Sequence, residues 1–73
     1  MQYNKVLVFA LYARKGGKFR LIDIYTSFIQ ARIRMNEIAK SGKFTDANIY
    51  EEEINISGRK TIGLVDCWTN VKL

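Results

Sequence analysis

Two apolar runs separated by a glycine pair open the chain. The first run extends from Val6 to Ala13 and ends at Arg14, and the second begins after Gly16 and Gly17. A membrane-spanning helix needs roughly 20 predominantly apolar residues, so the first run is too short to cross a bilayer. It also lacks the small-residue cleavage site that follows the apolar core of a secretory signal. Because glycine adopts positive φ angles without steric cost, the two runs predict a β-hairpin with Gly16-Gly17 as its turn.

This turn predicts which residues of the hairpin face each other. A two-residue loop sets three cross-strand pairs: Lys15 with Lys18, Leu11 with Ile22, and Phe9 with Ile24. One face of the hairpin is then wholly apolar and is predicted to be core: Leu7, Phe9, Leu11, Ile22 and Ile24. The other face is mixed and aromatic: Val6, Val8, Ala10, Tyr12, Arg14, Phe19, Leu21, Asp23 and Tyr25.

A helical pattern follows the hairpin. Ser27 and Gln30 have the spacing of a capping box, and Gly42 stands where a helix should end, so we expect a helix over residues 28–41. Five apolar residues recur at helical spacing and should cover the apolar face of the sheet: Phe28, Ala31, Met35, Ile38 and Ala39. Ile29 and Ile33 lie off this stripe.

Two further strand patterns complete the chain, over residues 48–56 (NIYEEEINI) and 61–71 (TIGLVDCWTNV). Residues 57–60 join them, and the length of the loop decides which side chains share a face. A loop of two or four residues gives one assignment and a loop of three gives the other. We favour the first, which places inside Tyr50, Ile54, Ile56, Val65, Cys67 and Val71, and outside Ile49, Glu51, Glu53, Ile62, Leu64 and Trp68.

The order ββαββ predicts a single α+β domain over residues 1–73, with two β-hairpins in a mainly antiparallel, two-layer arrangement and one helix packed on one face. A single helix covers only one face of a sheet, so the opposite face should meet water, a second copy or a partner. Leu21 and four aromatic residues make that face apolar enough to be an interface: Tyr12, Phe19, Tyr25 and Trp68. Alternatively, these aromatic residues are scattered over a twisted sheet and partly cover one another.

Charge is unevenly distributed along the chain. The net charge is +5, with nine basic and two acidic residues in 1–43 but three basic and five acidic residues in 44–73. In a ββαββ topology the helix returns towards the first turn, away from Arg59-Lys60. We therefore predict a cationic binding element formed by Arg14, Lys15, Lys18, Arg20, Lys40 and Lys43. Such an element suits an acidic protein groove or a phosphate backbone. Solvated lysines that prevent edge-to-edge aggregation are the alternative.

The chain offers little for catalysis. It has no histidine to act as a general base, and Cys67, its only cysteine, is best interpreted as a small buried apolar residue. The segment RKGGK precedes a strand, whereas a phosphate-binding loop precedes a helix. The acidic run 51–53, with Asp66, contains ligands for a hard cation, but such runs are more often solvated strand faces. We expect no enzymatic activity, cofactor or metal, and a cytoplasmic location.

The succession "VLVFALYARKGGKFRLIDIYTSFIQARIRMNEIAK", followed by "NIYEEEINI" and a closing strand, resembles small ββαββ proteins of bacteria and their phages. In these proteins a strand ending in Y-T-S leads into a helix with a central alanine, here Ala31. This pool of proteins includes anti-CRISPR and other anti-defence inhibitors. The resemblance implies a phage-encoded inhibitor that acts in the host cytoplasm and brings no catalytic residues.

We therefore expect a non-enzymatic binding protein that blocks a surface of a host protein or nucleoprotein complex, without binding a membrane. A small basic nucleic-acid-binding protein that contacts phosphates is one alternative. A homodimer is another, formed through the sheet faces or through Ile29 and Ile33 of the helix.

Overall fold

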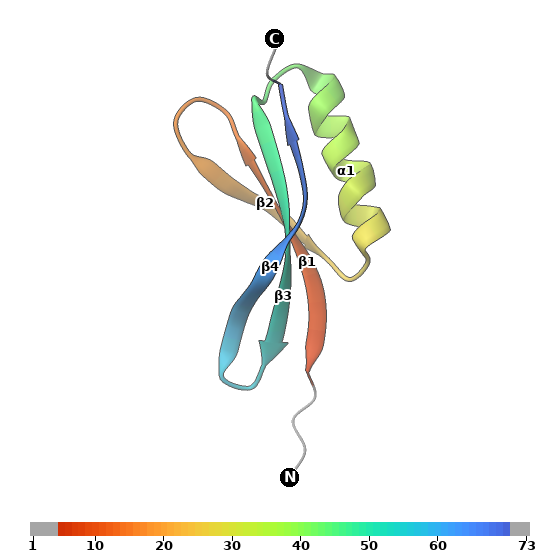
Figure 1. The fold of residues 1–73 in the computed structure, drawn as a ribbon, viewed down its shortest axis with the longest axis vertical. Helices are drawn as coiled ribbons and strands as arrows, with labels where there is room; N and C mark the ends of the chain where they lie inside the picture. The colour runs from red at the N-terminus through yellow and green to blue at the C-terminus, as the bar shows by residue number, and fades with distance from the viewer. Residues whose placement is uncertain (1–4, 71–73) are drawn as a thin grey trace.

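The computed structural model describes residues 5–70, and it confirms the expected ββαββ order (Figure 1). The five elements are β1 (Val6–Arg14), β2 (Phe19–Tyr25), α1 (Phe28–Ser41), β3 (Asp46–Asn55) and β4 (Gly58–Thr69). The helix has the bounds that its capping residues and apolar spacing predict. Residues 1–4 and 71–73 lie outside the described range. The prediction that Val71 is a core residue concerns one of these residues.

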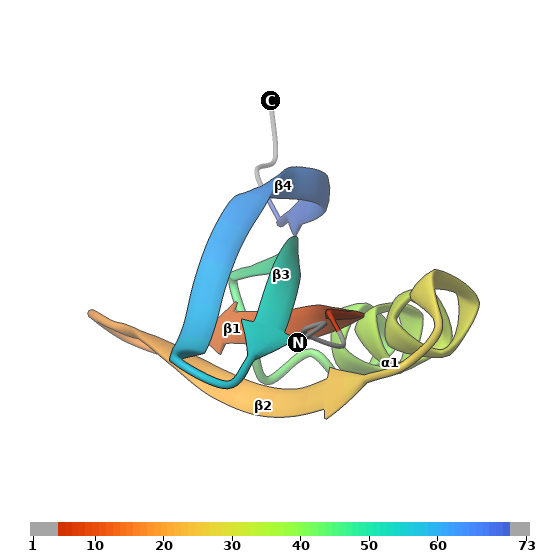
Figure 2. The ribbon, with the colours of Figure 1, turned by 90° about the horizontal axis from the view of Figure 1, so that it is seen from below.

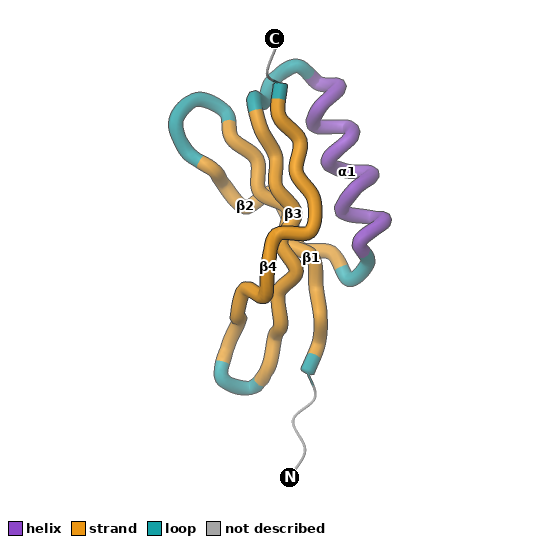
Figure 3. The backbone as a smooth tube through the Cα atoms, viewed as in Figure 1, coloured by secondary structure: helices purple, strands orange, loops and turns teal. Residues whose placement is uncertain are grey.

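The four strands form one antiparallel sheet in the order β2-β1-β3-β4, so the two hairpins meet through β1 and β3 (Figure 3). The molecule is elongated, with principal extents of 52 × 24 × 18 Å. Figure 2 shows the helix on one side of the sheet and the β3–β4 hairpin turned away from the plane of β1 and β2. The helix lies along only part of the sheet, and the β3–β4 turn extends well beyond it (Figure 1).

The core lies between α1 and the two central strands. Its buried members are Leu11 and Ala13 of β1, Ala31, Met35 and Ile38 of α1, and Ala47 and Ile49 of β3. Burial of a large aliphatic side chain such as Leu11, Ile38 or Ile49 contributes roughly 1.5–3 kcal/mol. The predicted helix stripe is confirmed, because Phe28 also packs against this cluster while Ile29 and Ile33 are exposed.

The two ends of the helix differ in how they are capped. Ser27 has the extended backbone of an N-cap residue, and its carbonyl oxygen accepts a hydrogen bond from the amide of Ala31 at 3.2 Å. Its side chain makes no capping hydrogen bond, so the predicted capping box is wrong in that respect. Gly42 ends the helix with φ of 73°, a left-handed conformation that glycine adopts without a Cβ clash.

The first hairpin contains a β-bulge, so its register differs from the predicted one. Arg14 faces Phe19 and Tyr12 faces Leu21 as expected, but the register shifts between Leu11 and Tyr12. Beyond the shift, Phe9 faces Tyr25 instead of Ile24, and Leu11 faces Asp23 instead of Ile22. One extra residue in a strand exchanges the faces of all side chains that follow.

The core assignment of this hairpin is therefore only partly right. Ile22 and Tyr25 pack against the core, whereas Ile24 pairs with Ala10 on the opposite face. Leu7 was expected in the core but is exposed. Lys15 and Lys18 are not paired in the ladder; they belong to the loop, where Gly16 has the expected positive φ.

On β3 the inside and outside faces are the opposite of those predicted, whereas Ile62 and Leu64 of β4 are exposed as predicted. Ile49 is paired with Leu11 and lies in the core, and Trp68, opposite Ala47, packs against the same cluster. Four residues predicted to be inside are exposed: Ile54, Ile56, Val65 and Cys67. The reason is that β3 also pairs with β1, and this pairing, rather than the turn, decides which face of β3 meets the helix. Two bulges shift the β3–β4 register further.

Candidate functional site

The sheet face turned away from α1 has no element covering it within residues 5–70. We call it the reverse face. The β1–β3 register has no bulge, so every second residue of these strands lies on this face, together with the residues they pair with. Its members are Val6, Val8, Ala10, Tyr12 and Arg14 of β1; Phe19, Leu21 and Ile24 of β2; Asp46, Asn48, Tyr50, Glu52 and Ile54 of β3; and Arg59, Thr61, Leu64, Cys67 and Thr69 of β4.

The four predicted aromatic anchors do not share this face. Tyr12 and Phe19 lie on it, and Tyr12 packs edge-to-face against Tyr50 with ring centroids 5.6 Å apart. Tyr25 and Trp68 instead pack against the core on the helix side. Burial raises the pKa of the Tyr25 hydroxyl, and the nearby charge of Asp23 adds to this shift.

The reverse face is nevertheless apolar. Val8 and Ala10 are buried at its centre, and five large apolar side chains around them are exposed: Val6, Phe19, Leu21, Ile54 and Leu64. Cys67 is also on this face as an exposed free thiol, so its predicted burial is wrong. An exposed apolar surface of this kind commonly marks an interface.

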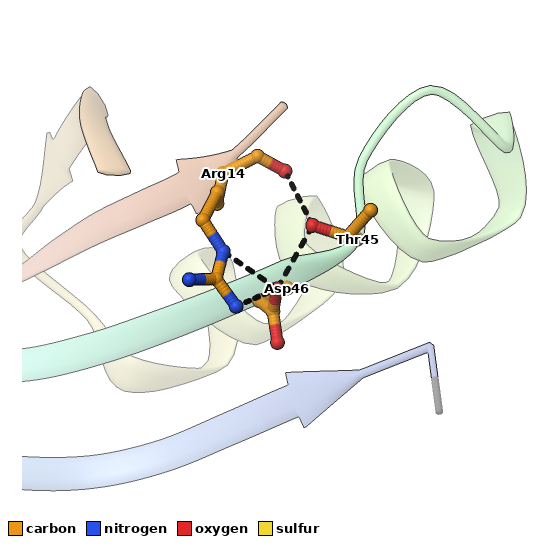
Figure 4. Close-up of polar contacts among 3 residues, drawn as sticks. All are labelled: Arg14, Thr45 and Asp46. Atoms are coloured by element: carbon orange, nitrogen blue, oxygen red, sulfur yellow. Dashed lines mark hydrogen bonds and ion pairs between the residues drawn. The ribbon is translucent and has the colours of Figure 1, made fainter. Parts of the chain in front are cut away.

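Arg14 differs from the other predicted cations because it is already engaged within the chain (Figure 4). Its Nε and Nη2 atoms both donate to Oδ2 of Asp46, at 2.9 and 2.6 Å. The Thr45 hydroxyl lies 2.8 Å from the same oxygen, and the Arg14 guanidinium lies 4.9 Å from the ring centroid of Phe19. The hydrogen bonds from Arg14 and then Thr45 hold the pKa of Asp46 below its ordinary value.

A second ion pair lies on the reverse face near the β3–β4 turn. Glu52 is 2% exposed, and its Oε1 lies 2.9 Å from Nε of Arg59. The other carboxylate oxygen accepts a hydrogen bond from the Thr61 hydroxyl at 3.4 Å. Sequence reasoning assigned Glu52 no role, because alternation within an acidic run does not reveal which carboxylate is buried.

The other acidic residues do not form a metal site. Glu53 lies 3.5 Å from Lys5, and Asp66 lies 3.8 Å from Arg32. Among residues 5–70, no group of three or more potential metal ligands occurs. The hypothesis that Glu51, Glu53 and Asp66 together hold a cation therefore has no geometric support in the described range.

The remaining predicted cations lie at one end of the molecule in two groups, one on the β1–β2 hairpin and one at the end of α1, on opposite sides of it (Figure 1 and Figure 2). We call the two groups together the cationic end: Lys15, Lys18, Arg20, Lys40 and Lys43. As expected, the β1–β2 loop and the end of α1 both lie at the end of the molecule opposite the β3–β4 turn (Figure 1). All five side chains are exposed, and within residues 5–70 none has an ion-pair partner.

Phe44 connects the two parts of the cationic end. A hollow of about 310 Å³ is lined by Lys15 and Arg20 with Ala13, Ile22 and Phe44. A second hollow of about 340 Å³, on the side of α1, is lined by Arg34, Glu37, Ile38, Ser41, Lys43 and Phe44. Phe44 was not singled out from the sequence, and the only signal for it was its position directly after Lys43.

Comparisons with protein-family models, with curated protein sequences and with solved structures find no match to this chain. In the described part of the chain, α1 is neither long enough nor apolar enough to cross a membrane. The geometry described above thus offers two candidate sites. The cationic end is charged, and the reverse face is apolar.

Proposed function

We propose that this protein is a non-enzymatic binding protein that places its cationic end on an acidic surface of a partner protein and blocks that surface. The separation of charge carries this proposal. Five of the seven acidic residues are in ion pairs, and their partners are Lys5, Arg14, Arg32, Arg34 and Arg59. Among residues 5–70, six basic residues have no ion pair, and all of them except Lys60 belong to the cationic end. Such a concentration of one sign steers association with a partner of the other sign.

The surroundings of these cations favour a protein partner over a nucleic acid. The two hollows share the partly buried ring of Phe44, and Ile22 adds a second partly buried apolar side chain to one of them. Apolar side chains of a protein pack against such side chains, whereas a phosphate backbone gains nothing from them. Single-stranded nucleic acid instead needs exposed aromatic rings for stacking. Phe44 is partly buried against the core, and the ring of Phe19 already contacts Arg14.

The resemblance to small ββαββ phage proteins gives the proposal a biological setting. A phage-encoded inhibitor of the anti-CRISPR or anti-defence type would act in the host cytoplasm on a defence protein or nucleoprotein complex. Blockade of an acidic surface needs no catalytic residue.

Single charge reversals test the proposal. Tagged wild-type protein is incubated with bacterial lysate treated with nuclease, and captured proteins are identified by mass spectrometry and then titrated as purified partners. Lys15→Glu and Lys43→Glu should each weaken binding of the purified partner at least about tenfold, because each replaces an attraction with a repulsion. Lys60→Glu is the matched control, because Lys60 is also exposed and has no ion pair within residues 5–70 but lies at the opposite end.

Two outcomes would overturn this function. If Lys60→Glu weakens binding as much as Lys15→Glu does, net charge matters but the cationic end is not the site. If the protein captures only nuclease-sensitive nucleic acid, anisotropy titrations with a labelled single-stranded oligonucleotide at low and high salt should follow. A steep loss of that binding with salt would replace the proposal with phosphate binding.

A further inference from the structure

The reverse face carries no unpaired charge within residues 5–70, although the chain as a whole is strongly positive. The strand registers place four charged residues on it: Arg14, Asp46, Glu52 and Arg59. They form two ion pairs, with closest distances of 2.6 Å between Arg14 and Asp46 and 2.9 Å between Arg59 and Glu52. The face is therefore electrically neutral, and its remaining members are apolar or uncharged.

Neutrality allows this face to meet a second copy of itself. Two copies related by a twofold axis present the same surface to each other, so any excess charge on that surface would meet itself. The cationic end would repel a second copy for this reason, whereas the reverse face would not. A strongly acidic partner, in contrast, gains no attraction from a surface whose charges are already paired.

The lengths and number of the strands set an upper limit on the area that two reverse faces can bury. β1 and β3 contain 9 and 10 residues. At 3.3–3.4 Å per residue these strands run roughly 30 Å, and four strands at about 4.8 Å spacing span roughly 19 Å. A flat, fully matched rectangle of this size sets an upper limit on the order of 1,100 Å² for two faces in contact, which is close to the roughly 1,000 Å² expected of a specific interface.

The exposed side chains on this face are those that an interface needs to cover. Leu64 is 53% exposed and Leu21 is 43% exposed, and they come from the two edge strands, β4 and β2. Tyr12 and Tyr50 lie between them on the central strands. Aromatic and aliphatic side chains surrounded by paired charges are typical of the buried centre of protein interfaces.

We infer that the reverse face is the twofold interface of a homodimer of this protein. Leu21 and Leu64 of each copy are buried against the other copy, and the cationic ends stay outside the interface. The inference does not depend on the proposed function. Lys15→Glu should leave the dimer intact, so a loss of partner binding and a loss of dimerisation are separate results.

Sedimentation equilibrium across a concentration series tests the dimer. We expect wild-type protein to sediment with the mass of two chains at high concentration. Leu64→Glu should raise the dimer dissociation constant at least about 100-fold, because the twofold axis buries an unpaired carboxylate from each copy. Ile33→Glu is the matched control, since Ile33 is 55% exposed but lies on the outer side of α1, and this variant should remain dimeric.

A second variant, circular dichroism and the reactivity of Cys67 distinguish a loss of dimerisation from a loss of the fold. Leu21→Glu on β2 should also dissociate the dimer, and circular dichroism should show native secondary structure in all three variants. Cys67, the only cysteine, lies on the reverse face, so a thiol reagent should modify it more slowly in the dimer than in a monomer. Wild-type protein at high concentration should react slowly, and Leu64→Glu at the same concentration should react fast.

The inference fails if wild-type protein sediments as a monomer throughout the series. It also fails if Ile33→Glu dissociates the dimer while Leu21→Glu and Leu64→Glu do not, because the helix would then be the interface. Fast modification of Cys67 in wild-type protein that sediments as a dimer would likewise place the interface elsewhere.

Discussion

At the scale of single residues, the contact between Arg14 and Asp46 joins the end of the first strand to the start of the third. The two residues are opposite each other in the β1–β3 register, and their side chains are linked by two hydrogen bonds. The amide of Thr45 also donates to the Arg14 carbonyl oxygen at 2.9 Å. These contacts anchor the segment that leads from the helix back into the sheet.

Replacement of Asp46 should show how much the contact with Arg14 stabilises the fold, because this stabilisation depends on pH. Because the pKa of Asp46 is lowered in the folded protein, its stabilisation is complete above the ordinary value of 3.8 and is lost as pH falls through the folded-state pKa. Asp46→Asn should therefore be less stable than wild type at pH 7, with the difference shrinking towards pH 3. Urea denaturation of both proteins at pH 7 and pH 3 measures this difference in the free energy of unfolding.

Asp23→Asn serves as the control for that comparison, because Asp23 is exposed and, within residues 5–70, its side chain accepts a hydrogen bond only from the neighbouring amide of Ile24, at 2.8 Å. A destabilisation by Asp46→Asn that is equal at pH 7 and pH 3 would contradict an ionic role for the carboxylate.

At the scale of elements, the β3–β4 hairpin depends on a buried carboxylate. Glu52 lies on the reverse face, and the side chain of Arg59 from the facing strand neutralises it. A buried charge that loses its partner is strongly destabilising, whereas a neutral isostere at the same place is tolerated better. The hairpin is therefore held by this pair as well as by its backbone ladder.

Truncation of Arg59 should test this dependence. Because Glu52 is almost fully buried but Arg59 is partly exposed, Arg59→Ala should destabilise the fold by about 1–3 kcal/mol. Adding Glu52→Gln should recover part of the loss, since it removes the uncompensated charge. Chemical denaturation of the wild type, both single variants and the double variant completes a double-mutant cycle, which gives the coupling energy between the two side chains. Strictly additive effects would show that the two side chains do not act as a pair.

At the scale of the whole molecule, the helix protects one part of an elongated sheet. The core cluster joins α1 to Leu11, Ala13, Ala47 and Ile49, whereas the far part of β3 and β4 near their turn lies beyond the helix (Figure 1). Local opening is easiest where few buried apolar contacts oppose it. The two parts of the sheet should therefore differ in their opening free energies.

Amide hydrogen exchange measured by NMR should show this gradient. We expect the amides of Leu11, Ala47 and Ile49 to exchange slowest, and those of Ile54 and Arg59 to exchange faster. A comparison of Leu64→Glu with wild type separates protection by the helix from protection by a second copy. Uniform protection along β3 in the monomeric variant would contradict the prediction.

Local sequence signals determined the order of elements and the helix of this protein. Apolar spacing of 3.6 residues, a serine before the helix and Gly42 after it act within a few residues of each other, so residues 28–41 could be assigned without knowledge of the rest. The glycine pair likewise indicated the first hairpin. The placement of the β1–β2 loop and the end of α1 at the same end of the molecule also followed from element order.

Only the tertiary structure decided which faces those strands present and which charges remain free. Bulges depend on how two whole strands fit together, and one of them moved Tyr25 to the helix side. The pairing of β1 with β3 joins residues about forty positions apart, and it placed Ile49 inside and Arg14 beside Asp46. Such long-range contacts leave no periodic signal in the chain. The division into a charged end and a neutral apolar face therefore arises from how the strands pair.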